Sequence, residues 1–371
     1  MDSELRSLWH QAAELDDTLR AGDDDLALLA AKRIHPEPYT REKLFSRMSH
    51  GRPVVFNDYV VPLRGGDRGD IAATLVDLYR HGFPRSQKAR VQRGPGRYRK
   101  QVSVHELLDV WQRGRGVISV TDLHVRGTRV TKTMNIDGLA EFNLLRTGSS
   151  DMAYQEMMTL VISSSRNVTD SHSDDPDGSN HAFLGRKLWL AWETFEGEAA
   201  GLEDNSRSQI DDKAAFDPRA WLSLPSACWW TVSAGETLFL PGRLTHKVVT
   251  LEKYLGVGGF YVALPCAINT ITRWTQHKAL WELHTHKNDH LVPQITRAIT
   301  KKVRELRDAP RAMQERWGYD FLQHDLDELE ALDEATKRRL LQNRDFARMI
   351  DEVRAAAGSS VINDAACYST A

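Results

Sequence analysis

The sequence predicts a mainly β core that lies between N- and C-terminal α-helical elements. From residue 154 to 268, short runs of β-branched and aromatic residues are bounded by Gly, Pro, Asp and Asn, as in antiparallel strands of a sandwich or barrel. The flanking segments instead repeat apolar residues at helical spacing. With 371 residues, 41% of them hydrophobic, the chain can build one elaborated core or two domains, and a disordered or fibrous protein is excluded.

The part of the chain before the core is predicted to be mixed in structure. Residues 1–50 are expected to be helical, with Leu5, Leu8 and Trp9 on one face. Residues 51–153 are expected to form an α/β elaboration, with a strand at 53–56 and helices at 71–79 and 104–111. Inside it, residues 85–100 carry seven basic residues and no acid. We expect a mobile, solvated loop there; contact with an acidic substrate or nucleic acid is the alternative.

The core itself, residues 154–268, has the strongest strand signals. Strands are predicted at 159–163, 187–192, 228–232, 237–240, 247–251 and 255–263. Residues 196–227 are rich in Asp, Ser and Glu and are predicted to be a surface excursion or a lid. Helical spacing returns over residues 269–357, and the small, polar residues 358–371 are predicted to be a disordered tail.

Charge and cysteine usage narrow the partners and the compartment. The chain has 49 basic and 51 acidic residues, so it lacks the basic field that attracts nucleic acid or an anionic membrane over a distance. Its three cysteines, Cys228, Cys266 and Cys367, are too few for a disulfide framework. No leader-like segment and no apolar run of about 18 residues occurs. We therefore expect an intracellular protein, cytoplasmic or nuclear, without membrane or nucleic-acid partners.

Three residues form a candidate metal centre. His172 and Asp174 are two residues apart, so on an extended segment their side chains point the same way. His246 begins a later strand and can complete a set of two imidazoles and one carboxylate. Such a facial triad leaves adjacent positions open and suits Fe(II) that must bind a cosubstrate and then O₂. Thiolate ligands would favour zinc instead, and no cysteine lies near these residues in the sequence.

Lys187 is a candidate anion-binding residue. It stands in a run of otherwise apolar residues, Leu188 to Leu190, and burial of an ammonium is costly unless it meets an anion. A lysine that reaches solvent from the end of a strand is the alternative interpretation.

The segment from about residue 159 to 265 resembles the JmjC-type, cupin-fold Fe(II)- and 2-oxoglutarate-dependent oxygenases, and a weaker similarity occurs at 52–59. The resemblance implies a double-stranded β-helix, also called a jelly roll, and it matches His172, Asp174 and His246 to the iron ligands. It also matches Thr169 and Lys187 to positions that hold the far carboxylate of 2-oxoglutarate. The chain departs from many relatives at Gly178, where an Asn is common.

The function that we expect is therefore oxygenation that consumes 2-oxoglutarate and O₂ at Fe(II). Hydroxylation of a C–H bond in a protein or peptide side chain, with release of succinate and CO₂, is the first hypothesis. Oxidation of a small molecule, such as an amino acid or a natural-product intermediate, is the second. Lysine demethylation and a non-catalytic cupin-like binding protein are further alternatives. The C-terminal helices are a possible homodimerisation element, since relatives of similar length often dimerise through such helices.

Overall fold

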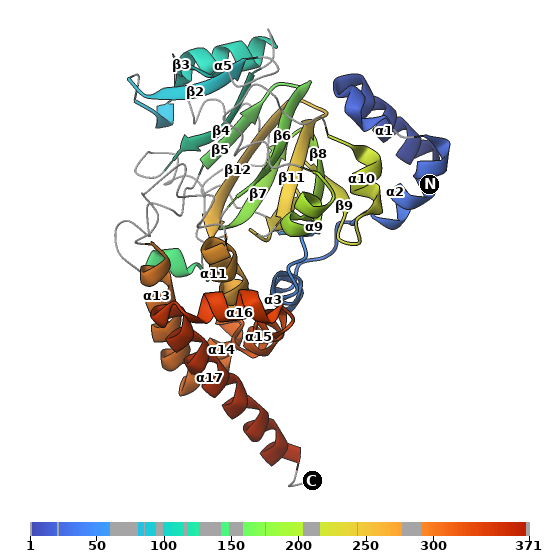
Figure 1. The fold of residues 1–371 in the computed structure, drawn as a ribbon. Coiled ribbons are helices and arrows are strands. Elements are labelled where there is room, and N and C mark those ends of the chain that lie inside the picture. Colours follow the sequence, from blue (N-terminus) through green and yellow to red (C-terminus); the bar gives the residue numbers. More distant parts are fainter. Residues whose placement is uncertain are drawn as a thin grey trace.

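Two antiparallel β-sheets with helices around them form the fold of the computed structural model (Figure 1). Its strands, within the described part of the chain, form two open sheets and not one closed barrel. The expectation of antiparallel sheets flanked by helices is thus confirmed. The structure describes residues 2–20, 22–59, 81–84, 86–93, 99–114, 118–125, 142–147, 159–174, 176–202, 216–242, 244–276 and 291–368.

The larger sheet has the strand order β1-β10-β7-β12-β5-β4-β2-β3. Strands from segment 51–153 extend it at both edges, because β1 pairs with β10 and β4 pairs with β5. The predicted elaboration before the core is therefore part of the same sheet. The strands of this sheet are β1 (Val54–Phe56), β2 (Lys88–Arg93), β3 (Arg99–Ser103), β4 (Ile118–His124), β5 (Thr159–Ser163), β7 (Asp177–Leu184), β10 (Thr237–Leu240) and β12 (Tyr254–Tyr261).

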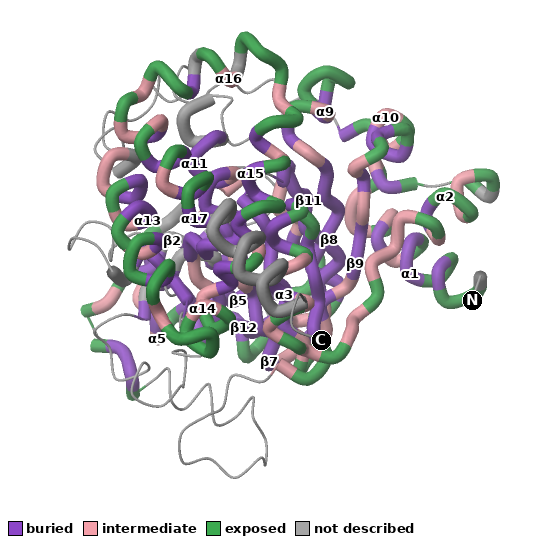
Figure 2. The backbone as a smooth tube through the Cα atoms, turned by 90° about the horizontal axis from the view of Figure 1, so that it is seen from below, coloured by how far each residue is buried: buried purple, intermediate pink, exposed green. Residues whose placement is uncertain are grey.

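The smaller sheet has the order β6-β11-β8-β9 and packs against the larger one. Its strands are β6 (Asn167–Ser173), β8 (Arg186–Glu193), β9 (Cys228–Ser233) and β11 (Leu244–Thr250). An apolar cluster joins the two facing surfaces, with Trp189 and Trp230 from the smaller sheet and Ala182 and Leu238 from the larger. This surface of the smaller sheet is called its inner face below. The strands appear buried in the middle of the molecule (Figure 2).

The opposite, outer face of the smaller sheet is covered by the N-terminal helices. Leu190 and Trp192 of β8 pack against Leu5 and Trp9 of α1 (Asp2–Leu15). The other described helices of segment 1–50 are η1 (Asp17–Leu19), η2 (Asp23–Asp25), α2 (Leu26–Ala31) and α3 (Arg41–Ser49). Helices thus occupy much of segment 1–50. Leu5, Leu8 and Trp9 are buried, because they lie on the face of α1 that packs against the sheet.

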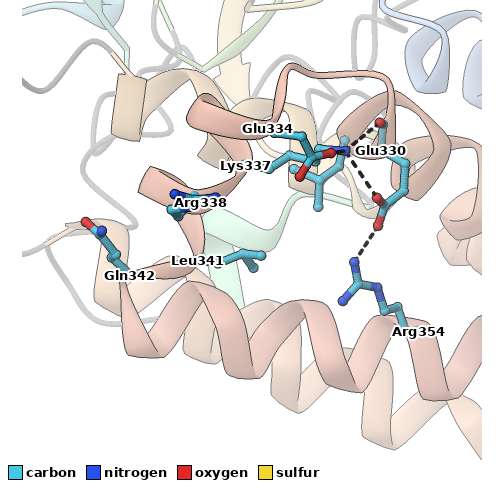
Figure 3. A pocket seen from close by; sticks show the side chains of 8 residues that line it. Glu330, Glu334, Lys337, Arg338, Leu341, Gln342 and Arg354 are labelled. Carbon is cyan, nitrogen blue, oxygen red and sulfur yellow. Dashed lines mark hydrogen bonds and ion pairs between the residues drawn. The ribbon is translucent and has the colours of Figure 1, made fainter.

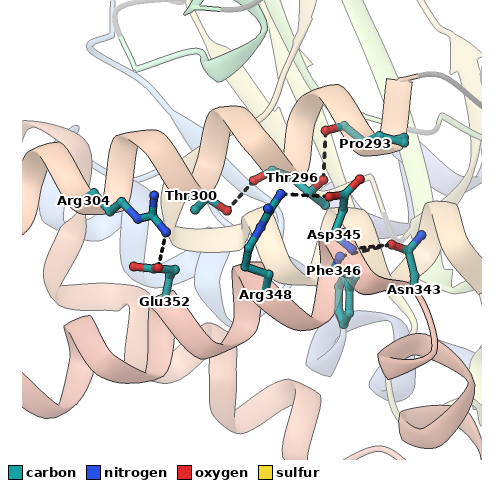
Figure 4. Close-up of polar contacts among 9 residues, drawn as sticks. All are labelled: Pro293, Thr296, Thr300, Arg304, Asn343, Asp345, Phe346, Arg348 and Glu352. Atoms are coloured by element: carbon teal, nitrogen blue, oxygen red, sulfur yellow. Dashed lines mark hydrogen bonds and ion pairs between the residues drawn. The ribbon is translucent and has the colours of Figure 1, made fainter.

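The C-terminal helices pack against each other below the sheets (Figure 1). They are α11 (Ala267–Gln276), α13 (Leu291–Arg307), α14 (Arg311–Trp317), η5 (Tyr319–Phe321), α15 (Leu322–Glu330), α16 (Glu334–Leu341) and α17 (Arg344–Tyr368). Ion pairs join their surfaces: Arg304 of α13 pairs with Glu352 of α17 (Figure 4), and Glu330 pairs with Arg354 at a groove beside α16 (Figure 3). The proposed homodimer through these helices stays a prediction.

Three sequence predictions differ from the structure. The basic segment 85–100 is not a plain loop, because its described parts belong to β2 and β3. Ala89 and Val91 alternate with polar residues, and both are buried together with Val102. That alternation is the strand signal that the charge of the segment obscured. A helix at 71–79 lies outside the described residues, whereas the helix predicted at 104–111 is present as α5 (Val104–Arg113).

The second difference concerns segment 196–227. Instead of a purely surface excursion, it contributes α10 (Pro218–Ser223) to the outer face of the smaller sheet, where Phe216, Trp221 and Leu224 are buried beside α1. It follows α9 (Thr194–Ala199) in the chain. The third difference is the tail, because α17 continues to Tyr368. Its alanines, such as Ala355 and Ala356, are strong helix formers and favour continuation of the helix.

No helix in the described ranges combines the length and the apolar character that crossing a lipid bilayer requires.

Candidate metal centre

Two neighbouring strands bring the predicted ligands together. β6 and β11 pair antiparallel, and His172 stands directly opposite His246 in their register. Asp174 follows His172 by two residues at the end of β6. The structure thus joins residues that are more than seventy positions apart in the chain. The sequence prediction that these three side chains meet is consistent with this geometry.

The three side chains form a compact set of nitrogen and oxygen donors. One ligand atom from each of His172, Asp174 and His246 lies within 4.8 Å of the other two. The imidazole rings are 4.2 Å apart between centroids, and Nε2 of His246 is 3.9 Å from Oδ2 of Asp174. His246 is buried, whereas His172 and Asp174 are half-buried. The group could therefore hold a metal ion at a place that solvent can still reach.

Hydrogen bonds to main-chain carbonyls orient both histidines. Nδ1 of His172 is 2.8 Å from the carbonyl oxygen of Asp170, and Nδ1 of His246 is 3.3 Å from that of Leu244. A carbonyl oxygen only accepts, so each Nδ1 carries the proton and each Nε2 keeps its lone pair for a metal. Burial, reinforced by the neighbouring His172, lowers the pKa of His246 well below its usual value. His246 is therefore neutral at pH 7, as a metal ligand must be.

The donor set fits iron. Two imidazole nitrogens and one carboxylate oxygen form the 2-His-1-carboxylate set that is typical of non-haem Fe(II) sites with open positions. No thiolate takes part, which agrees with the sparse cysteines of the chain. The structure thus supports a metal-binding group that is compatible with iron.

A second polar group lies deeper on the same face. Rows of paired residues cross from β6 through β11 to β8, and every second row faces inward. The three inward rows are His172, His246 and Ala191; then Thr169, Val248 and Trp189; then Asn167, Thr250 and Lys187. The predicted anion-binding residues Thr169 and Lys187 thus share the inner face with the metal-binding group.

Lys187 is buried with its charge unpaired among the described residues. Only 2% of its surface is exposed, and its ammonium lies 4.5 Å from the centre of the Tyr254 ring. No carboxylate of the described part of the chain lies within ion-pair distance of it. Burial lowers the pKa of Lys187 to about 7. The alternative that this lysine reaches solvent is wrong.

Two residues of this deep row were missed by the sequence analysis. The amide Nδ2 of Asn167 and the hydroxyl Oγ1 of Thr250 are buried, and neither has a hydrogen-bond partner among the residues that the structure describes. Buried polar atoms are rarely left unsatisfied, so a pair of them beside a buried ammonium points to a polar ligand. The register between strands, which carries this information, cannot be read from a single sequence.

Gly178 lies on β7, in the larger sheet opposite the metal-binding group. This residue pairs with Leu240 and Phe260, and a Cβ built on it would meet no described atom within 4 Å. The asparagine nearby, Asn180, instead accepts a hydrogen bond from the Tyr254 hydroxyl. The larger sheet therefore has open space beside Gly178.

Comparison of the sequence with models of known protein families and with curated proteins gives no match. The chemistry of the site must therefore be inferred from its own residues.

Proposed function

We propose that the protein is an Fe(II)- and 2-oxoglutarate-dependent oxygenase. The observation that carries the proposal is one sheet face that holds both a His-Asp-His group and a buried, unpaired lysine. The His-Asp-His group is the donor set of an oxygen-activating iron site. The buried lysine can bind one carboxylate of a dicarboxylate.

The strand order supports a double-stranded β-helix of eight strands, β5 to β12. In chain order these strands alternate between the sheets except at β8 and β9, which both belong to the smaller one. β5, β7, β10 and β12 belong to the larger sheet, and β6, β8, β9 and β11 to the smaller. The sheet neighbours are β5-β12-β7-β10 and β6-β11-β8-β9, so late strands insert between early ones. A jelly roll, the architecture of cupins, has two four-stranded sheets of this kind. Strands β1 to β4 then extend one of them.

The distance between the two polar groups suits a short dicarboxylate. Lys187 lies four residues along β8 from Ala191, which pairs with His246. At about 3.4 Å per residue the two rows are roughly 14 Å apart along the strand. We propose that one carboxylate of the dicarboxylate meets the ammonium while its other end reaches toward the metal ligands. Thr169, in the row between them, can donate a hydroxyl hydrogen bond.

Each residue then has a defined task. His172, Asp174 and His246 hold Fe(II), and Lys187 and Thr169 orient 2-oxoglutarate. When bound, Fe(II) and 2-oxoglutarate supply the chemistry that activates O₂ and inserts one oxygen atom into a C–H bond. The stacked rings of Trp189 and Trp230, 6.3 Å apart, keep the interior beside His246 apolar and exclude water from it.

A protein or peptide side chain is the substrate class that we propose. Asp174 is 35% exposed, whereas Lys187 is almost fully buried, so the metal-binding end of the interior is the open one. A side chain presented by a large molecule can approach a metal there. A small-molecule substrate is the other outcome that the experiment below distinguishes.

The test is Fe(II)-dependent conversion of 2-oxoglutarate to succinate by the purified protein, with lysate proteins and separately with metabolites added. We expect turnover in the wild type and in His324→Ala, an exposed control histidine on α15, and none in His172→Ala. Mass spectrometry should find a gain of about 16 Da, one oxygen atom, in the substrate pool. Absence of both metal binding and turnover in the wild type would contradict the proposal.

A further inference from the structure

An irregularity in β6 allows Thr169 and His172 to face the same way. Side chains of a strand alternate, so residues three apart normally point to opposite faces. Here Val248 pairs with Thr169 and His246 pairs with His172, so Asp170 and Ser171 together stand opposite the single residue Lys247. This is a β-bulge, which adds one residue to one strand and turns the following side chains. The inward direction of His172 therefore depends on the bulge.

Lys247 is buried on the outer side of this bulge. It follows His246 directly, so its side chain points away from the metal-binding group. Its Nζ lies 2.8 Å from Oδ2 of Asp16 and 3.8 Å from Oδ1 of Asp170. Only 5% of the Lys247 side chain is exposed, and the ring of Phe216 covers it at 5.5 Å. One ammonium thus ties the N-terminal segment to the bulge.

Asp16 is held in place for this contact. It follows α1, caps η1 and accepts hydrogen bonds from the backbone N–H and the hydroxyl of Thr18. Burial acts to raise the pKa of Asp16, but the charge of Lys247 and these hydrogen bonds outweigh burial and lower it. The carboxylate is therefore ionised at neutral pH and forms a true ion pair with Lys247.

Asp170 connects Lys247 to His172, one of the proposed metal ligands. Its carboxylate faces Lys247, while its main-chain carbonyl accepts the hydrogen bond from Nδ1 of His172. A carbonyl that orients a ligating imidazole fixes both its tautomer and its ring direction. The contacts therefore run from Asp16 through Lys247 and Asp170 to His172.

We propose that Lys247 is a positioning residue of the metal centre, and that Asp16 makes the N-terminal segment 1–31 part of that centre. The inference rests on the proposed metal-binding function, since it concerns the orientation of His172 as a ligand. Loss of the ammonium lets the bulge relax, and His172 then no longer presents Nε2 beside His246.

The test measures Mn(II) binding, with Mn(II) as a redox-stable probe for Fe(II), well below the melting temperature of each variant. Lys247→Met should weaken the affinity by about 10-fold or more, as expected for loss of a residue that orients a ligand. Lys247→Arg should keep it within about 3-fold, because the charge and the ion pair are retained. Leu188→Ala, a destabilising change on the same outer face, should leave it unchanged.

A second readout uses the metal-free protein. The Nδ1 proton of His172 should give an exchange-protected NMR signal in the wild type and in Leu188→Ala, and lose it in Lys247→Met. If Lys247→Met binds Mn(II) with wild-type affinity and keeps the Nδ1 proton signal of His172, this inference is wrong, but the proposed function is not affected. Failure of the wild type to bind Mn(II) would overturn the proposed function as well. If Lys247→Met does not fold, Asp16→Asn decides, and wild-type behaviour in both readouts would overturn the inference.

Discussion

Two buried lysines lie on opposite faces of the same four-stranded sheet. On the outer face, Lys247 contacts Asp16 and Asp170 beneath the N-terminal helices. On the inner face, Lys187 contacts the Tyr254 ring, and no described carboxylate lies within reach. Both ammonium groups are removed from water, and within the described part of the chain only Lys247 has a countercharge.

The difference indicates that Lys247 stabilises the fold, whereas Lys187 is placed to bind a ligand. Burial of an unpaired charge destabilises a protein, so a folded chain keeps such a group where something else depends on it. The polar atoms of Asn167 and Thr250 beside Lys187 are unsatisfied in the same way. Replacing Lys247 by an apolar residue should therefore lower the stability of the protein, whereas the same replacement of Lys187 should raise it.

The largest effect on stability is expected for Lys247→Met. The change removes the cation that lies 2.8 Å from the largely buried carboxylate of Asp16, and breaking a buried ion pair in this way costs about 3 kcal/mol or more. Urea unfolding of wild type and variant measures the change. An unchanged free energy of unfolding would show that this pair contributes nothing to the fold.

Lys187→Met should instead stabilise the ligand-free protein at pH 7, by up to several kcal/mol. A tenfold change in a protonation equilibrium corresponds to about 1.4 kcal/mol, and burial lowers the pKa of Lys187 from 10.5 to about 7. In the wild type the unfolded chain binds the extra proton between these values, so wild-type stability should rise with pH through this window. The difference in the free energy of unfolding between Lys187→Met and the wild type should therefore become smaller as the pH rises. A variant less stable than the wild type would indicate a structural role for Lys187.

The affinity for 2-oxoglutarate should depend on pH through the same lysine. The carboxylate requires the protonated ammonium, and with a pKa of about 7 the protonated fraction falls as pH rises. The dissociation constant of the metal-loaded protein should therefore increase by up to about tenfold for each pH unit above 7. Titration calorimetry between pH 6.5 and 8.5 follows this change, and the slope should be absent in Lys187→Met. A flat wild-type profile would mean that Lys187 does not bind the ligand.

The smallest effect is expected for Thr250→Val. This change removes a hydroxyl that has no partner in the ligand-free structure, so the free energy of unfolding should stay within about 0.5 kcal/mol of the wild type or rise slightly. Loss of one hydrogen bond to the ligand should weaken 2-oxoglutarate binding by about 2- to 10-fold. Val249→Ala, on the outer face, is the control, because it should lower stability and leave binding unchanged. Equal affinity in Thr250→Val and wild type would exclude Thr250 from the site.

Much of the fold could be predicted because its strands alternate clearly or are richly apolar. The predicted strands at 159–163, 187–192, 228–232 and 237–240 correspond to β5, β8, β9 and β10. Those at 247–251 and 255–263 overlap β11 and β12. β6 and β7 gave no strand signal, since they carry the polar residues of the site and of its opposite wall. The hairpin of β2 and β3 was not predicted because the many basic residues of this segment suggested a solvated loop.

The candidate site could be predicted only in part. Spacing along the chain indicated His172 and Asp174, because period two is a local property. Thr169 lies three residues before His172, a spacing at which regular alternation would place the two on opposite faces, and only the bulge at Lys247 reconciles them. Asn167 and Thr250 depend on pairing across strands, which a single sequence does not reveal.

Binding of 2-oxoglutarate with and without metal tests the central claim most directly. Calorimetry under anaerobic conditions should compare the metal-free protein, the Mn(II)-loaded protein and His246→Ala in the presence of Mn(II). If the inner face holds metal and dicarboxylate together, tight binding occurs only in the Mn(II)-loaded wild type. Binding that is absent throughout, or equally strong without Mn(II) and in His246→Ala, would contradict the account.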